Sequence, residues 1–478
     1  MGYAGLLAGL ILPWLLGVVW LRVRWLKPVE TNWPTLLGYG YLAGALATTI
    51  VMRLLDLTGA KLSFGSVGLT LCVLIAAGVW AGNGTPLRFR DLGAEWRPLA
   101  NWQKVAFGGL LAIILIRMAG LGMELIWRPL FPWDAWSQWA TKSRVWFELG
   151  HLVQFVSNDV WLAGTVPAAY TDPAPNYPPA ISLLQVWTCY SLGRWDDALM
   201  NLPWLQCAAA LGLAFYGQAR SWKVPPLPAL LCTYFLLSLP ILDAHVALAG
   251  YADLFMGAIY GMAAMAFFQW TKSRDRWQGA VAILFGLGCA FIKQPGILWI
   301  LTFVPAVMVA RMPRAGLIGA GALAIAGVLV LIVLGEVGNF YLFGYPVRLH
   351  YVSVWGPLAQ NLLMLDNWHL YWYLVAAALL VSLPRLLDSR MRALTVLVAG
   401  AFAFLLVVFF FTAVNAWAED FTTVNRAFLH MSPMLLFYVL VLIYEGTESR
   451  RLRGLSNDQV SSRIRDSKHI ERAELSTT

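Results

Sequence analysis

The chain has 478 residues, of which 59% are hydrophobic and only 12% are charged. Soluble domains carry about 25% charged residues, so this composition excludes a soluble globular protein and predicts an all-α polytopic membrane protein. The formal net charge is +9, but its distribution, described below, follows membrane topology, and no nucleic-acid partner is expected. The five cysteines lack metal-ligand spacing, so neither a disulfide framework nor a zinc site is predicted.

Thirteen apolar segments follow one another along the chain, and a span needs about 17–25 residues. They are 3–20, 35–55, 65–82, 104–127, 196–219, 226–243, 247–270, 278–292, 296–311, 315–334, 369–387, 393–412 and 427–445. The segments 278–292 and 296–311 are separated because the Lys-Gln-Pro-Gly sequence between them interrupts a helix. The sequence therefore predicts about thirteen transmembrane helices.

The basic residues indicate which loops face the cytoplasm. With the N-terminus outside and the C-terminus inside, 24 of the 34 Lys and Arg fall in inside segments, and every inside loop is positive. This partition is the one that the positive-inside rule requires. Basic residues follow segment 3–20 and do not precede it, so a first transmembrane helix is expected in place of a cleaved signal peptide.

Three long external segments result from this topology: 128–195, 335–368 and 413–426. Within the first, the stretch 134–149 alternates tryptophans with polar residues, which is typical of a helix lying in the membrane interface. The stretch 178–192 is too short to span comfortably and is predicted to be a second juxtamembrane helix. The charged tail, 447–478, is expected to be solvated in the cytoplasm.

Asp134 is the first candidate catalytic residue, because it follows span 104–127 at the outer surface. A carboxylate there suits a general base for an acceptor hydroxyl. An Asp at this place is equally suited to cap a helix over 135–149, and the spacing leaves both interpretations open. The neighbouring Trp133 and Trp136 suit either stacking on a sugar or anchoring at the interface.

Further candidates for substrate binding lie in two external stretches. Asp172, Asn176 and Tyr177 belong to a proline-rich loop and could bind sugar hydroxyls, although turn chemistry alone also favours Asp and Asn there. Asp253 ends the sequence Gly-Tyr-Ala-Asp at the outer end of span 247–270. An acidic residue entering a span usually faces the protein interior.

Two cations are candidates for a phosphate site. Lys293 lies at the break between two short helices, where it would combine with the N-terminus of helix 296–311 to bind an anion. Arg426 opens the last span and offers a planar donor fork suited to phosphate. The alternative for both is snorkelling to lipid headgroups. The six histidines have no metal-ligand spacing, so no metal or other cofactor is expected.

The order of these elements, and the side of the membrane on which they lie, resembles the GT-C superfamily of integral membrane glycosyltransferases. The similarity is to the branch of protein O-mannosyltransferases and lipid A aminoarabinose transferases. It is carried by the loop with Asp134, the Tyr-Pro-Pro start of 178–192, the sequences 250–253 and 291–296, and Arg426. It covers about 104–445. The chain then divides into three N-terminal helices (1–103), a catalytic module (104–446, with external loop 128–195) and a cytoplasmic tail (447–478).

Two departures limit what the resemblance implies about substrates. The family often has an acidic pair in the first external loop, whereas Asp134 is followed by Ala135. The aminoarabinose branch has a Lys where this chain has Tyr177. The identity of the sugar is therefore not transferred.

The resemblance implies a polyprenyl-phosphate-linked sugar donor and an inverting transfer at the periplasmic face of a bacterial inner membrane. Asp134 would be the base, and Lys293 and Arg426 would stabilise the departing phosphate without a metal. The acceptor would be a lipid, glycan or protein. An alternative is a transporter or flippase of an anionic lipid-linked substrate. Transporters often carry internal repeats with helix breaks in both halves; no repeat is evident here, which favours the enzyme.

Overall fold

The computed structural model describes residues 2–23, 32–82, 96–337, 339–342 and 345–448. These residues form a helical bundle, as predicted. The helices are α1 (Gly2–Trp20), α2 (Trp33–Leu57), α3 (Phe64–Gly82), α5 (Asn101–Trp127), α6 (Thr141–Leu149), α7 (Asn158–Leu162), α8 (Ala180–Leu192), α9 (Leu202–Ser221), α10 (Pro226–Leu237), α11 (Pro240–Ala247), α12 (Asp253–Ser273), α13 (Arg276–Ile292), α14 (Gly296–Leu301), α15 (Phe303–Arg311), α16 (Pro313–Val337), α17 (Trp355–Ala359), α18 (Tyr371–Val381), α19 (Arg392–Phe411), α20 (Ala416–Glu419) and a last helix, Val424–Glu448.

Strands occur only in two small sheets of the described chain. β1 (Phe155–Val156) pairs in parallel with β2 (Tyr170–Thr171) inside the first long loop. β3 (Asn339–Leu342) and β4 (Tyr345–Arg348) form an antiparallel hairpin after α16.

Each of the thirteen predicted apolar segments contains at least one helix, but fewer qualify as spans by length and composition. In the described residues, nine helices are long and apolar enough to cross a membrane, or ten if α10 and α11, which are bent by 60° at their junction, form one span. The others are shorter: α13, the pair α14–α15 and α18. The described residues thus show a polytopic helical membrane protein, in which nine or ten helices qualify as spans by length and composition, and the three shorter ones would complete the predicted thirteen.

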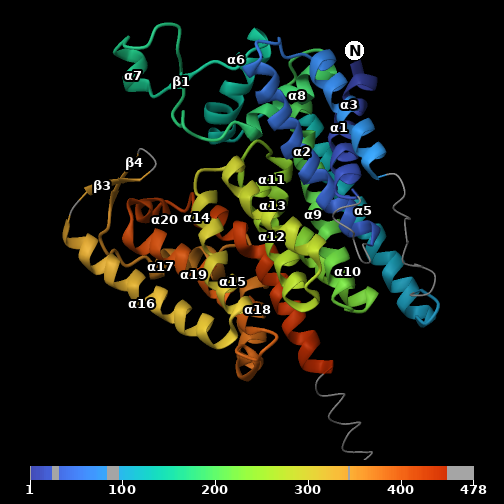
Figure 1. Ribbon diagram of the computed structural model, residues 1–478, viewed down its shortest axis with the longest axis vertical. Helices are drawn as coiled ribbons and strands as arrows, with labels where there is room; N and C mark the ends of the chain where they lie inside the picture. The colour runs from blue at the N-terminus through green and yellow to red at the C-terminus, as the bar shows by residue number, and fades with distance from the viewer. Residues whose placement is uncertain (1, 24–31, 83–95, 338, 343–344, 449–478) are drawn as a thin grey trace, which may run out of the picture.

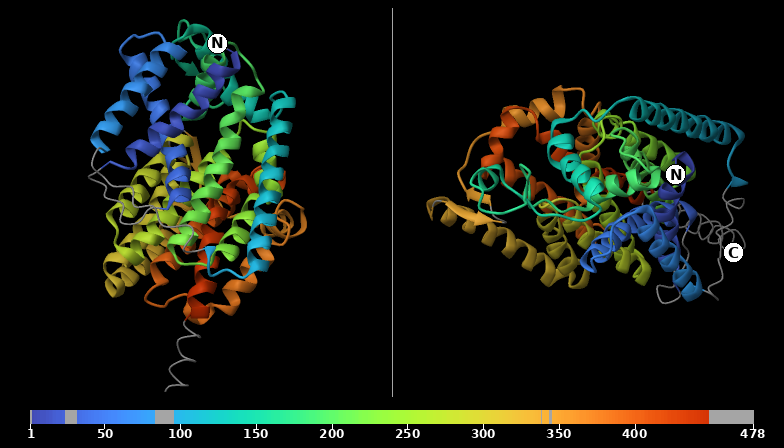
Figure 2. Two further views of the ribbon diagram at one scale, coloured as in Figure 1. Left: turned by 90° about the vertical axis from the view of Figure 1, so that its right-hand side faces the viewer. Right: turned by 90° about the horizontal axis from the view of Figure 1, so that it is seen from above.

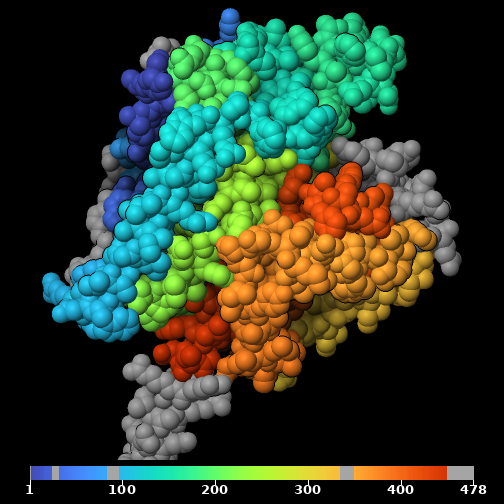
Figure 3. All heavy atoms as spheres, turned by 180° about the vertical axis from the view of Figure 1, so that it is seen from behind, coloured from blue at the N-terminus to red at the C-terminus, as the bar shows by residue number. Residues whose placement is uncertain are grey.

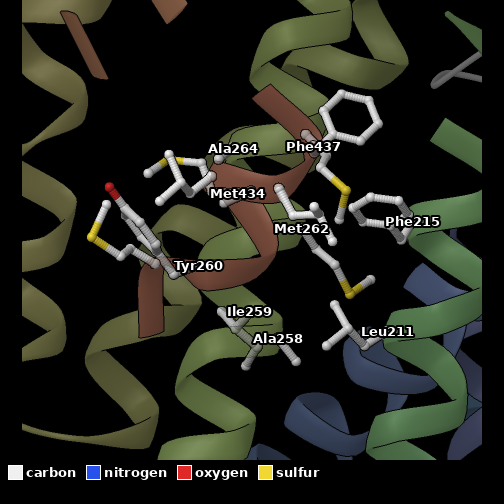
Figure 4. Packing of buried hydrophobic residues seen from close by; sticks show 14 of the residues in the cluster. Leu211, Phe215, Ala258, Ile259, Tyr260, Met262, Ala264, Met434 and Phe437 are labelled. Atoms are coloured by element: carbon white, nitrogen blue, oxygen red, sulfur yellow. The ribbon is translucent and has the colours of Figure 1, made fainter. Parts of the chain in front are cut away.

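Helix α12 forms the centre of the bundle. In its most apolar stretch of 18 residues, 89% of the residues are buried within the protein. Its apolar side chains pack between α9 and the last helix (Figure 4). Leu211 and Phe215 of α9, Tyr260 and Met262 of α12, and Phe437 of the last helix belong to this core. The helix is apolar on all sides because it is surrounded by other helices.

Two helices run along the outside of the bundle, α5 and α16 (Figures 1 and 2). Only 17% of the residues in the corresponding stretch of α5 and 6% of those in that of α16 are buried within the chain. An exposed apolar helix of this kind is stable in lipid, because every backbone hydrogen bond is made within the helix.

The N-terminal helices share the central core. The Tyr39 hydroxyl of α2 donates to the Met262 carbonyl of α12 at 2.7 Å. Asn32 caps α2 and also donates to the Gly217 carbonyl of α9 at 2.8 Å. Residues 1–103 are therefore packed against residues 104–446 in the part of the chain that is described.

The long loop 128–195 and the N-terminus lie at one end of the molecule, and the last helix ends at the opposite end (Figure 1). Seen from behind, the atoms of loop 128–195 lie above those of the residues that follow α19 (Figure 3). Helix α8, predicted to be juxtamembrane, is almost entirely buried against α1, α2 and α6. Residues 449–478 of the predicted charged tail lie outside the described residues.

Candidate functional site

A buried carboxylate, that of Asp253 at the start of α12, is the centre of the charged cluster. One oxygen, Oδ1, accepts a hydrogen bond from Lys293 Nζ at 2.7 Å and lies 2.8 Å from His430 Nε2. The other, Oδ2, accepts from Arg426 Nε at 2.9 Å. The side chain is 1% exposed. Burying a carboxylate this deeply is costly unless it is paired; here both oxygens have partners, and the positive end of the α12 dipole adds to the compensation.

Arg426 joins Asp253 to Asp134. Its Nη1 donates to Asp134 Oδ2 at 2.7 Å, and its guanidinium carbon lies 4.2 Å from the centroid of the Tyr251 ring. The side chains of Arg426 and Asp134 are 19% and 25% exposed. The cluster therefore extends from a fully buried carboxylate to one that solvent and a substrate can reach.

Lys293 reaches the cluster because the chain leaves the helix at this residue. Its backbone is extended, with φ −150° and ψ 146°, and Pro295 follows. A Cβ on Gly296 would lie 2.0 Å from the Cys289 carbonyl oxygen, so only glycine fits the turn that starts α14. The break predicted from the sequence is thus the feature that directs Lys293 towards Asp253.

Asp134 precedes an unusual helical turn. Residues Ala135–Ala140 form a π-helix, η1, which continues into α6, and such turns are frequent at functional sites. Asp134 itself has helical dihedral angles and makes no side-chain capping hydrogen bond. Its carboxylate engages Arg426 and not the helix start, so the capping interpretation does not account for it.

The proline-rich loop contributes Tyr177 to the edge of the cluster. The Tyr177 ring stacks on Trp139 of η1, with centroids 5.3 Å apart and planes at 23°. Burial raises the pKa of Tyr177 to about 12, and the negative charge of Asp253 adds to this shift. The Asn176 carbonyl accepts from Gln294 Nε2 at 3.2 Å, which ties the loop to the break beside Lys293.

Asp172 does not join the cluster. It is fully buried and pairs with Lys142 of α6 at 3.4 Å, while Lys142 Nζ also donates to the Ala174 carbonyl at 2.6 Å. Burial raises the pKa of Asp172 and lowers that of Lys142. The pair fastens the proline-rich loop to α6, so the structure gives Asp172 an internal partner and no access to a substrate.

Trp133 and Trp136 flank Asp134 on the surface. They are 68% and 44% exposed, and their rings meet edge to face with centroids 4.8 Å apart. Both rings are therefore exposed, and either a sugar or the membrane interface could contact them.

Four of the predicted site residues thus meet directly: Asp134, Asp253, Lys293 and Arg426. Two members of the cluster were not singled out beforehand, His430 and Tyr251. His430 follows Arg426 by four residues, a spacing that places both side chains on one helix face. This four-residue spacing is the sequence feature from which the place of His430 in the cluster could have been predicted. The two cations are balanced by the two carboxylates, and the described residues contain no group of metal-ligating side chains.

The meeting of Asp253 with Arg426 depends on two glycines of α12. A Cβ on Gly257 would lie 2.8 Å from the Leu429 carbonyl oxygen, and one on Gly261 would lie 2.7 Å from Pro433 Cβ. Small residues allow helices to approach closely in this way. Gly257→Leu is expected to separate α12 from the last helix and to cost about 1–3 kcal/mol of stability, the usual penalty of overpacking.

Thermal unfolding of the detergent-purified protein measures this cost. Gly286→Leu is the matched control, because a Cβ on Gly286 of α13 meets no atom within 4 Å. Equal melting temperatures for the two variants would show that the close approach at Gly257 is unimportant.

No protein-family model, curated protein or solved structure matches this chain.

Proposed function

We propose that the protein is a membrane glycosyltransferase that moves a sugar from a polyprenyl-phosphate donor to an acceptor hydroxyl, with inversion. The observation that supports it is the position of Arg426, which contacts a solvent-accessible carboxylate, Asp134, and a buried one, Asp253, next to Lys293. A candidate base and two candidate phosphate ligands therefore occur within a single hydrogen-bonded cluster.

In this reaction Asp134 takes the proton of the acceptor hydroxyl, and the acceptor oxygen attacks the anomeric carbon of the sugar. The bond between that carbon and the phosphate oxygen breaks, and polyprenyl phosphate leaves with the bonding electrons. Attack from the face opposite the phosphate inverts the configuration. Lys293 and Arg426 stabilise the charge that grows on the departing phosphate.

The ion pair between Arg426 and Asp134 gives the donor a second role. A donor phosphate competes with Asp134 for the guanidinium group, since both are anions that accept from its N–H groups. Once the phosphate occupies Arg426, the Asp134 carboxylate is free to accept a proton. Asp253 is saturated by its own partners and keeps both cations in place throughout.

The proposed reaction takes place on the outer face, with the N-terminus outside, thirteen crossings in total and the tail 447–478 in the cytoplasm. The partition of Lys and Arg supports this orientation. In a chain without its five native cysteines, a Cys at Ser157 is expected to react with an impermeant reagent in intact cells, while one at Ser461 is expected to be shielded. The reverse labelling pattern would invert the orientation.

The function is tested by incubating the purified protein in detergent with polyprenyl-phosphate sugars and candidate lipid, glycan and peptide acceptors. Mass spectrometry is expected to detect an acceptor heavier by one sugar residue. If no acceptor gains mass while the protein in vesicles moves an anionic lipid-linked sugar between leaflets, the protein is a flippase and the transferase proposal is wrong.

A further inference from the structure

Another ion pair lies away from the cluster, between α5 and the bent pair α10–α11. Arg117 of α5 pairs with Asp243 of α11 and donates to the Ser238 carbonyl at 3.3 Å. Arg117 precedes Trp127, the last residue of α5, by ten residues, about 15 Å of helix, so it lies inside this span and not at its end. A charged side chain inside an apolar span is costly, so this arginine is a candidate for a functional role.

The pair lies at the break in the bent span. Ser238 is the C-terminal cap of α10, and Asp243 lies in the first turn of α11. The axes of the two helices differ by 60°. One guanidinium group therefore contacts a backbone carbonyl left free by the end of α10 and a carboxylate at the start of α11. Arg117 of the neighbouring helix α5 thus connects the two halves of the broken span.

Helix α11 leads from this pair to the cluster. The ring of His245 on α11 lies 5.6 Å from that of Tyr251, centroid to centroid. The Tyr251 ring lies under the Arg426 guanidinium. The backbone carbonyl of Tyr251 accepts a hydrogen bond from Trp204 Nε1 at 2.7 Å. Both histidine and tyrosine rings thus stand between the membrane ion pair and the arginine that contacts Asp134.

We infer that Arg117 is a positioning residue of the site: by fixing the start of α11, it keeps His245 against Tyr251 and thereby directs the Arg426 guanidinium at Asp134. The activity readout for this inference rests on the proposed transferase function, whereas the structural readout does not. Arg117 touches no member of the cluster, so its effect passes through α11 and Tyr251.

The test compares Arg117→Met with Arg53→Met, which removes an exposed arginine from another span, α2. Displacement of a reacting group by about 1 Å lowers a rate by about 10²-fold. Arg117→Met is therefore expected to lower kcat by about that factor per folded molecule, with the donor KM nearly unchanged. Hydrogen exchange of the backbone of 248–256 is expected to become faster in Arg117→Met and to stay unchanged in Arg53→Met.

A double variant, Arg117→Met with Asp243→Leu, separates positioning from the cost of an unpaired carboxylate. Replacing both charges with apolar side chains often restores stability. The inference predicts a stable double variant whose kcat stays low; a stable one with normal kcat would overturn it. If the unaltered protein transfers no sugar, the proposed function fails, but hydrogen exchange still decides: equal exchange of 248–256 in Arg117→Met and Arg53→Met would refute the positioning role.

Discussion

Asp134→Asn is expected to lower the turnover of sugar transfer by about 10²–10⁴-fold, the usual contribution of a general base. An asparagine cannot take up the proton of the acceptor, although its amide oxygen can still accept from Arg426. The fold, the helix over 135–149 and donor binding are therefore expected to stay nearly intact. The measurement is kcat of the purified, monodisperse variant, together with the dissociation constant of the donor.

Asp159→Asn is the matched control, because Asp159 is an exposed aspartate on α7 of the same external loop. It is expected to keep normal turnover. A near-normal kcat for Asp134→Asn would remove Asp134 from the chemistry. The base would then have to come from the substrate or from another residue, since Asp172 and Asp253 are both buried and paired.

Lys293→Met is expected to lower kcat by about 10²–10³-fold, the range found when one donor to a developing anion is removed. Donor affinity is expected to change much less, because the charge on the phosphate oxygen grows as the bond breaks. The variant should fold, since Asp253 keeps its contacts with Arg426 and His430. Single-turnover kinetics and donor-binding measurements give the two quantities separately.

Arg426→Lys provides a second, independent measurement at the same site. Lysine keeps the positive charge but lacks the planar fork that contacts two carboxylates at once. Its kcat is expected to fall too.

Arg128→Met is the control for lipid anchoring, because Arg128 is half exposed beside the outer end of α5 and has Glu124 as its ion-pair partner at 3.9 Å. If Lys293→Met lost no more activity than Arg128→Met, an interfacial anchor would be the better account of Lys293.

The helices were predictable from sequence because apolar length and helix breaks are local properties. The Lys-Gln-Pro-Gly sequence marked the break at Lys293 correctly, since proline and glycine act on their own backbone. The number of spans was less predictable. Helix α18, for example, has only 11 residues although the apolar segment 369–387 is longer, because the helix ends at Val381.

Partners across the chain were not predictable from a single sequence. The role of Asp134 stayed open because a helix cap and a base place the same residue at the same point. The contact with Arg426, 292 residues away in the sequence, shows that the carboxylate does not cap the helix; its role as a base stays a prediction. Asp172 likewise looked like a turn residue of a proline-rich loop, and its burial against Lys142 depends on how that loop folds onto α6.

The balance of charge within the cluster bears on which anions can occupy it. A free phosphate ion must displace Asp134 from Arg426 and has no further attachment to the protein. A phosphate carried on a lipid is confined to the bilayer beside the cluster, so its effective concentration there is far higher than that of the same amount dissolved in water. Inorganic phosphate is therefore expected to be a poor competitive inhibitor. Occupancy of the site would then depend mainly on how the anion is tethered to the membrane.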